Sequence, residues 1–212
     1  MTSSMRNSVD RYKRELIVNA AEELFFTKGF MQTSMTDIAQ HLAVGKPTIY
    51  QHFKSKGELL SEVCNRTTEF AADIARLSLG QDSTPPEKIR RIVRELSLTV
   101  MENRCSLAVL FREVKHLPPE ERTRLARNYH EFNNFVSEIL TEGMHSGDFR
   151  SVDLTVAVHA ISGAASWIFT WYHSDGRLSP EQIAEEMADL AVGMIQVGEG
   201  QTPPRRKTIA SD

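Results

Sequence analysis

Cysteine is scarce in this sequence, since only Cys64 and Cys105 occur among 212 residues. The two lie 41 positions apart within stretches of helical periodicity, so they provide neither a disulfide framework nor the Cys/His spacing of a metal site. We interpret both as buried small residues of a protein in a reducing compartment. The fold must therefore rest on a hydrophobic core rather than on cross-links.

Long hydrophobic runs are missing as well. No stretch approaches the ~20 apolar residues that span a bilayer, and residues 1–6 lack the apolar segment of a signal peptide. Hydrophobic residues nevertheless make up 41% of the chain, which is enough for a sizeable core. We therefore expect a cytoplasmic protein that has no membrane partner.

Sequence motifs of enzymes are also absent, since there is no Gly-rich phosphate loop and no nucleophile elbow. Two Glu-x-x-His pairs, Glu113/His116 and Glu142/His145, leave open a helical-bundle enzyme that binds metal through carboxylates and histidines. Such a site needs two further glutamates, and both pairs lie where a proline pair or a glycine ends the predicted helix. We therefore predict no catalytic residues, no metal ligands and no cofactor.

Strict alternation of polar and apolar residues does not occur, which disfavours surface strands. Apolar residues instead recur with a period near 3.6, and Gly29 and Gly147 mark helix ends. We predict an all-α protein of about nine helices, including a long one over 56–79 and a very apolar one over 152–173. The first eight or nine residues and residues 198–212 are predicted to be disordered.

Residues 33–53 have the pattern of two short helices joined by a tight turn. Ser34 is a favourable N-cap, and Asp37 three residues later completes an approximate capping box. Pro47 fits only the first turn of a helix, so the next helix must begin near Lys46. Such a pair of helices is shaped to enter a DNA groove.

The outer face of the second of these helices suits DNA recognition, because it mixes donors, acceptors and an aromatic ring. Residues 1–60 hold eight Lys/Arg and six Asp/Glu, a net charge of +2, whereas residues 61–212 hold 17 and 22, a net charge of −5. The sign agrees with a DNA-facing head on an acidic body. A plain helical hairpin with a solvated face remains the alternative at this point.

Two segments carry a family resemblance: AEELFFTKGFMQTSMTDIA over residues 21–39 and GKPTIYQHFKSKGELL over residues 45–60. They closely resemble the TetR family of transcriptional regulators. The resemblance implies an N-terminal DNA-binding head, a larger helical body, a homodimer and repression of target genes. We therefore divide the chain into a helix-turn-helix DNA-binding domain at 10–56, a ligand-binding and dimerisation domain at 57–197, and a disordered tail at 198–212.

The recognition face and the resemblance together give a set of contacts to double-stranded operator DNA. The predicted DNA-binding residues are Thr33, Ser34, Lys46, Pro47, Thr48, Tyr50, Gln51, His52 and Lys56. Two positions depart from the family pattern: Ala43 replaces a common turn glycine, and Gly57 replaces an acidic residue. A positive φ at Ala43 would cost ~1 kcal/mol.

The stretch over 152–173 is apolar on more than one face and rich in small residues, as expected when a helix packs on its own core and on a partner. Together with the last helix it can form a four-helix interface about a two-fold axis. The predicted interface residues are Ala160, Gly163, Ala164, Met187, Leu190 and Met194. The alternative is the buried central helix of a monomer.

The middle of the chain holds more bulky residues than a tight small bundle needs, which indicates a cavity for a small-molecule effector. The predicted ligand-binding residues are Met101, Arg104, Phe111, Arg112, Tyr129, Phe132, Trp167 and Trp171. Ordinary core packing, and surface positions for the two arginines, remain the alternatives.

Residues 142–150 and 171–181 are similar to TetR-family members that sense acyl-CoA thioesters in lipid or steroid catabolism. This similarity implies a repressor that a thioester releases from a palindromic operator. A multidrug-sensing repressor of efflux genes is the alternative, and its pocket should offer acidic and aromatic groups to cationic compounds.

Overall fold

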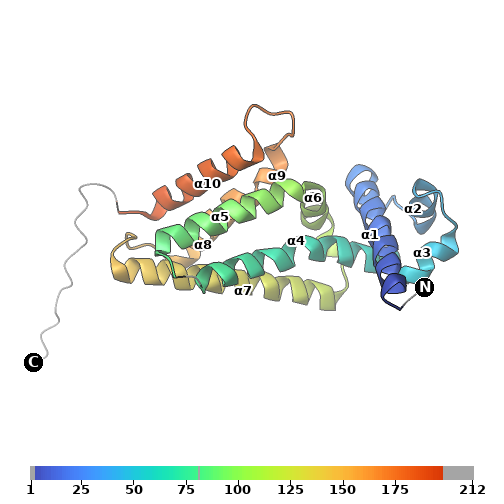
Figure 1. The fold of residues 1–212 in the computed structure, drawn as a ribbon, viewed down its shortest axis with the longest axis horizontal. Helices are drawn as coiled ribbons and strands as arrows, with labels where there is room; N and C mark the ends of the chain where they lie inside the picture. The colour runs from blue at the N-terminus through green and yellow to red at the C-terminus, as the bar shows by residue number, and fades with distance from the viewer. Residues whose placement is uncertain (1–2, 81, 198–212) are drawn as a thin grey trace, which may run out of the picture.

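The fold of the computed structural model is all-α, as predicted (Figure 1). The structure describes residues 3–80 and 82–197, so the predicted disordered tail at 198–212 lies outside the described residues. Within them are ten α-helices, one short 3-10 helix and no strand. The elements are α1 (Ser3–Lys28), α2 (Met35–His41), α3 (Lys46–His52), α4 (Lys56–Leu79), α5 (Pro85–Glu102), α6 (Arg104–Glu113), η1 (Val114–His116), α7 (Pro119–Ser146), α8 (Leu154–Ser166), α9 (Ile168–Trp171) and α10 (Pro180–Ile195).

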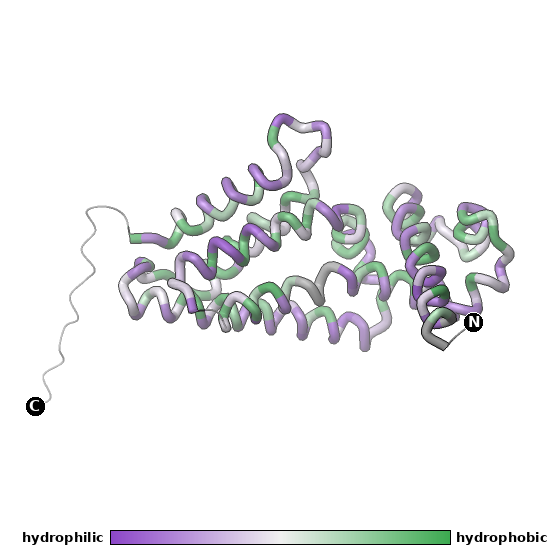
Figure 2. Tube along the Cα trace, viewed as in Figure 1, coloured by the Kyte–Doolittle hydropathy of each residue, from purple (hydrophilic) through white to green (hydrophobic). Residues whose placement is uncertain are grey.

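The helices form a small head and a larger body (Figure 1). α1, α2 and α3 make the head at one end of the molecule, and α4 leads from it into the body, where it packs against α7. α10 packs along α5. Hydrophobic and hydrophilic bands alternate along most helices (Figure 2), as expected when each helix turns one apolar face to the core.

Two predicted helix boundaries are wrong. Residues 3–9 are helical rather than disordered, because α1 begins at Ser3. Further along α1, Arg14 donates to the carbonyl oxygen of His52 at 3.1 Å and to the carboxylate of Glu62 at 2.9 Å. The predicted helix over 152–173 is divided at Trp167, where α8 ends and α9 begins.

The buried apolar residues form two clusters, one in the body and one centred on the head. The head cluster contains Phe25 of α1 and Phe53 after α3, both fully buried. It also contains Val109 of α6, Leu117 directly after η1, and Leu125 of α7. The head is therefore seated on the body through a shared core.

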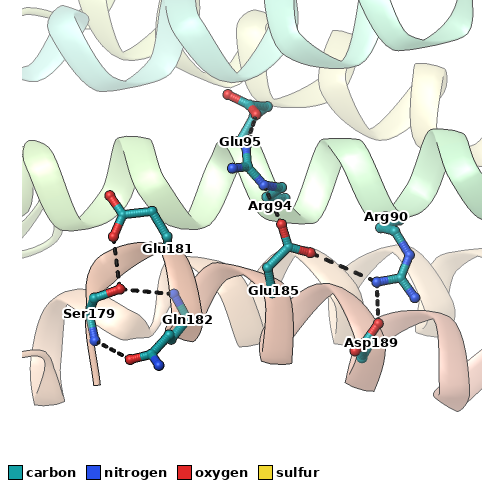
Figure 3. A network of polar contacts seen from close by, with 8 residues as sticks. All are labelled: Arg90, Arg94, Glu95, Ser179, Glu181, Gln182, Glu185 and Asp189. Carbon is teal, nitrogen blue, oxygen red and sulfur yellow. Dashed lines mark hydrogen bonds and ion pairs between the residues drawn. The ribbon is translucent and has the colours of Figure 1, made fainter. Parts of the chain in front are cut away.

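A polar network fixes the position of α10 on α5 (Figure 3). Arg94 donates to Glu95 and to Glu185, each at 2.6 Å, and Arg90 pairs with Asp189 and Glu185. These side chains are one-third to over one-half exposed, so each pair contributes only about 0–1 kcal/mol. The network therefore sets the register of the two helices more than it adds stability.

The segment Leu154–Trp171 has the length and composition of a membrane-crossing helix, with a mean hydropathy of 1.3. The expectation that no stretch is apolar enough to span a bilayer was therefore wrong for this segment. Only 33% of it is buried within the chain. It packs against α5 and α7 on one side and is divided at Trp167. Its exposed apolar side is the feature that a partner would have to cover.

The turn between α2 and α3 holds Ala43 at a φ of 53°, in the left-handed region. We expect Ala43→Gly to raise the free energy of unfolding by about 0.5–1 kcal/mol, because relief of about 1–2 kcal/mol of strain exceeds the extra unfolded-state entropy of glycine. Ala39→Gly, in the buried part of α2, is the control and should lower the free energy of unfolding by about 1 kcal/mol. Urea unfolding measures both, and a loss of stability in Ala43→Gly would contradict a strained turn.

Candidate nucleic-acid interface and ligand cavity

The start of α2 has the capping box that the sequence predicts. The Ser34 hydroxyl accepts from the Asp37 N–H at 3.2 Å and donates to the Asp37 carboxylate at 2.5 Å. The hydrogen bonds that the Ser34 hydroxyl and the Ser34 backbone N–H donate to the carboxylate lower the pKa of the Asp37 carboxyl. Thr33 is buried, and its hydroxyl lies within hydrogen-bonding distance of the carbonyl oxygens of Leu24 and Gly29. Both hydroxyls therefore have partners within the head, although Ser34 itself is exposed.

The outer face of α3 is free of such contacts. Ile49 and the C-cap residue Phe53 are buried and anchor the helix. The residues that remain exposed or half-exposed are Lys46, Pro47, Thr48, Tyr50 and Gln51. Within the described part of the chain Lys46 forms no ion pair, so its charge is available to a phosphate.

Two other predicted DNA contacts turn inward. The His52 side chain is only 8% exposed, with its Nδ1 atom 3.6 Å from the Asp10 carboxylate of α1. The Lys56 ammonium donates to the carbonyl oxygen of Phe30 at 2.7 Å and lies 4.3 Å from the centre of the Phe30 ring. Lys56 therefore ties the start of α4 to the loop after α1.

The end of α6 is hydrogen-bonded to the end of α1 and to the loop that follows it. Glu113 is only 7% exposed, and its carboxylate accepts from the Phe30 N–H at 3.4 Å and from Arg112 Nε at 3.1 Å. Arg112 also donates to the carbonyl oxygens of Phe25 and Phe26 in the last turn of α1. The His116 ring stacks on Phe30 with ring centres 5.3 Å apart. We name Arg112, Glu113 and His116 the α6 clasp.

Sequence reasoning noticed Glu113 and His116 only as a possible metal pair. In the structure His116 Nε2 lies 3.7 Å from Glu113, and no three His, Cys, Asp or Glu side chains of the described residues gather as a metal site. In the second pair, Glu142 binds Lys88 at 2.9 Å and His145 bonds to a carbonyl oxygen of its own helix. The adjacent Arg112 and Glu113 near the end of a predicted helix were the available signal in the sequence.

The two cysteines differ in burial. Cys64 of α4 is fully buried, as predicted, and this burial, with a smaller effect of the Glu113 carboxylate, raises the pKa of its thiol to about 12. Cys105 is only half-buried, so the prediction was wrong in degree for that residue. A thiol with so high a pKa carries almost no thiolate at neutral pH, which leaves Cys64 as a packing residue.

A cavity of about 110 Å³ opens among α4, α5, α6, α7 and α8. Three of the predicted ligand-binding residues line it: Phe111, Tyr129 and Phe132. The lining residues that the prediction did not include are Ala71, Leu96, Thr99, Val100, Leu107, Leu110, Asn128, Ser162 and Ser166. Ser162 and Ser166, four residues apart in a very apolar helix, were the signal in the sequence.

The other five predicted ligand residues do not line this cavity. Arg104 donates to the carbonyl oxygen of Tyr172 at 2.8 Å, and Arg112 belongs to the clasp. Met101 is buried in the body core. Trp167 and Trp171 are 60% and 46% exposed on the outside of α8 and α9.

The outer sides of α8 and α10 expose apolar and small residues. Ala160 and Gly163 of α8 are exposed, and nothing lies within 4 Å of a Cβ built on Gly163. Leu190 and Met194 of α10 are also exposed, and Met194 borders the same surface groove as Ala160. Ala164 and Met187, the remaining predicted interface residues, are half-buried.

Comparisons with known proteins agree with this arrangement. Residues 82–195 match the family described as tetracyclin repressor-like, C-terminal domain, and residues 17–63 match bacterial regulatory proteins, tetR family. The HTH-type transcriptional repressor KstR2 of Mycolicibacterium smegmatis is 28% identical over 193 residues, which cover 89% of this chain and 93% of that protein.

Two solved structures have the same fold. The TetR family regulator PfmR from Thermus thermophilus superposes with a TM-score of 0.77 at 29% identity, covering 84% of this chain and 97% of its own. AibR in complex with isovaleryl coenzyme A and operator DNA superposes with a TM-score of 0.73 at 26% identity, covering 87% and 98%. The C-terminal match alone spans more than half of the 212 residues of this chain. The chain therefore belongs to the TetR family of transcriptional regulators.

Proposed function

We propose that the protein is a cytoplasmic repressor, not an enzyme, which binds a palindromic operator as a homodimer and is released by an acyl-CoA thioester. One observation carries the proposal: α6 lines the cavity with Leu107, Leu110 and Phe111, and the same helix ends in the clasp that holds the head. A ligand in the cavity therefore contacts the element that positions the DNA-binding helices.

The proposed DNA contacts come from α3. Lys46, Pro47, Thr48, Tyr50 and Gln51 form its outer face, where lysine suits a phosphate and the others suit base edges or sugars. Thr33, Ser34, His52 and Lys56 instead shape the head, because their polar groups already have partners within it. The head ends near residue 56, where α4 begins, and the two heads of the dimer read half-sites about 34 Å apart.

The proposed dimer forms through the exposed sides of α8 and α10. Ala160 and Gly163 let a second helix approach closely, while Leu190 and Met194 supply apolar surface. The same contact explains why the apolar segment Leu154–Trp171 is only one-third buried in the single chain.

The lining of the cavity favours an acyl group over a cationic drug, because none of the lining residues that the structure describes carries a charged side chain. A cationic compound would lose its hydration there without gaining a carboxylate partner. AibR, similar over 87% of this chain, was solved with isovaleryl coenzyme A and operator DNA, which supports both proposed ligands.

Selection from random duplex DNA should recover an inverted repeat. On that repeat we expect Lys46→Ala to weaken binding evenly across related sequences and to reduce the slope of log affinity against log salt by about 0.9, because one phosphate contact is lost. Lys56→Ala is the comparison: it should lower the melting temperature and leave the slope unchanged, because its ammonium serves the Phe30 loop.

Gel-shift titrations over a range of salt concentrations and thermal melts measure these effects. Recovery of no inverted repeat would contradict the operator proposal. If Lys56→Ala reduced the slope of log affinity against log salt as much as Lys46→Ala, with no loss of stability, Lys56 would be a DNA contact after all.

Gly163→Arg should give a folded monomer that no longer binds the operator. The new side chain starts in open space on the single chain, so folding is preserved, but it blocks the close approach of a second helix. Asn134→Arg, at an exposed position of α7, is the matched control and should remain dimeric. Native mass spectrometry reads the result, and a monomeric wild type at micromolar concentration would contradict the proposed dimer.

A further inference from the structure

We infer that the acyl group admitted by the cavity is short, with about four or five carbon atoms. This inference rests on the proposed function and names the class of thioester that acts as effector. It separates short-chain acyl-CoA from the long-chain and steroid thioesters that the same fold could equally sense.

The size of the cavity sets the limit. Its volume is about 110 Å³. A dry cavity of about 150 Å³ lined by apolar side chains accepts one benzene ring, about 25 Å³ for each carbon. On that scale the cavity holds about four or five carbons, and a four-ring steroid would need roughly four times the volume.

The closed end of the cavity does not provide room for a longer chain. Leu96, Val100 and Phe132 line it, are at most 6% exposed, and belong to the main body core. Interiors of this kind are close-packed, so each extra methylene would displace core side chains. A longer acyl group therefore cannot enter without expanding the core.

Two polar groups of the cavity are already engaged within the chain. Thr99 and Ser162 donate to the carbonyl oxygens of Glu95 and Val158 in their own helices, both at 2.8 Å, so their hydroxyl protons are not available to a ligand. Phe111 and Tyr129 are 56% and 50% exposed, which places the mouth between them.

At this mouth the Tyr129 hydroxyl lies 3.0 Å from His159 Nδ1. The apolar end of a ligand therefore points inward, and its polar remainder leaves past the Tyr129–His159 pair. A thioester meets this requirement, because its large polar part follows directly after a short apolar tail.

The test is a titration of the complex between the full-length protein and its operator. The titrants are coenzyme A, its acetyl, butyryl, isovaleryl, octanoyl, palmitoyl and steroid-acyl thioesters, and cationic dyes. Calorimetry on the free protein measures affinity, and gel shift measures release. We expect affinity to peak at four or five carbons and to fall at least tenfold at octanoyl.

Two variants assign the preference to this cavity. Leu107→Ala enlarges it and should move the optimum to longer chains, whereas Leu140→Ala, a buried core change outside the cavity, should not. Ser162→Val fills part of the cavity. It should weaken the binding of isovaleryl-CoA at least tenfold and the binding of acetyl-CoA less.

The outcomes separate the inference from the function on which it rests. Tighter binding of palmitoyl or steroid thioesters than of butyryl and isovaleryl would overturn the short-chain inference and leave an acyl-CoA repressor. Release by dyes alone, with every thioester inert, would overturn the proposed effector class and the inference together. An unchanged optimum in Leu107→Ala would show that chain length is read elsewhere, and would overturn the assignment to this cavity.

Discussion

The contact between the end of α6 and the end of α1 is the constraint on which the rest of this structure depends. Glu113 brings a carboxylate into a buried site, where it is stable only because the Phe30 N–H, Arg112 and His116 surround it. Arg112 adds hydrogen bonds to the carbonyl oxygens of Phe25 and Phe26 in the last turn of α1. The orientation of the head on the body follows from these few bonds and from the apolar core beneath them.

On the proposed function, this geometry links ligand and DNA. α6 has only ten residues and ends in the clasp, so a shift at Leu107 or Phe111 reaches Glu113 within two turns. A ligand that prefers the shifted position weakens operator binding, and the operator weakens binding of the ligand by the same factor. A hundredfold preference of the ligand for the shifted position corresponds to about 2.7 kcal/mol. α4 also joins head and body, since it packs against α1 and against α7, and the clasp adds a second route beside it.

Local signals made the head predictable. Gly29, Ser34 with Asp37, and Pro47 each act within a few residues of themselves, so the ends of α1, α2 and α3 follow from the sequence. The start of α1 at Ser3 did not, because no acidic residue in its first turn marks it in the sequence. The cavity was the hardest part to predict, since an arginine on a helix can point to a ligand or to a carbonyl oxygen, and only tertiary packing decides, as it does for Arg104.

The most direct test of the central claim is the mutual dependence of the two binding events. Operator affinity is measured with and without butyryl-CoA, and butyryl-CoA affinity with and without operator, in the wild type and in Glu113→Gln. The account predicts one common factor in both directions for the wild type. In Glu113→Gln that factor should fall toward one while each ligand alone still binds. The account would be contradicted if the two wild-type affinities did not depend on each other. It would also be contradicted if Glu113→Gln kept the same factor as the wild type.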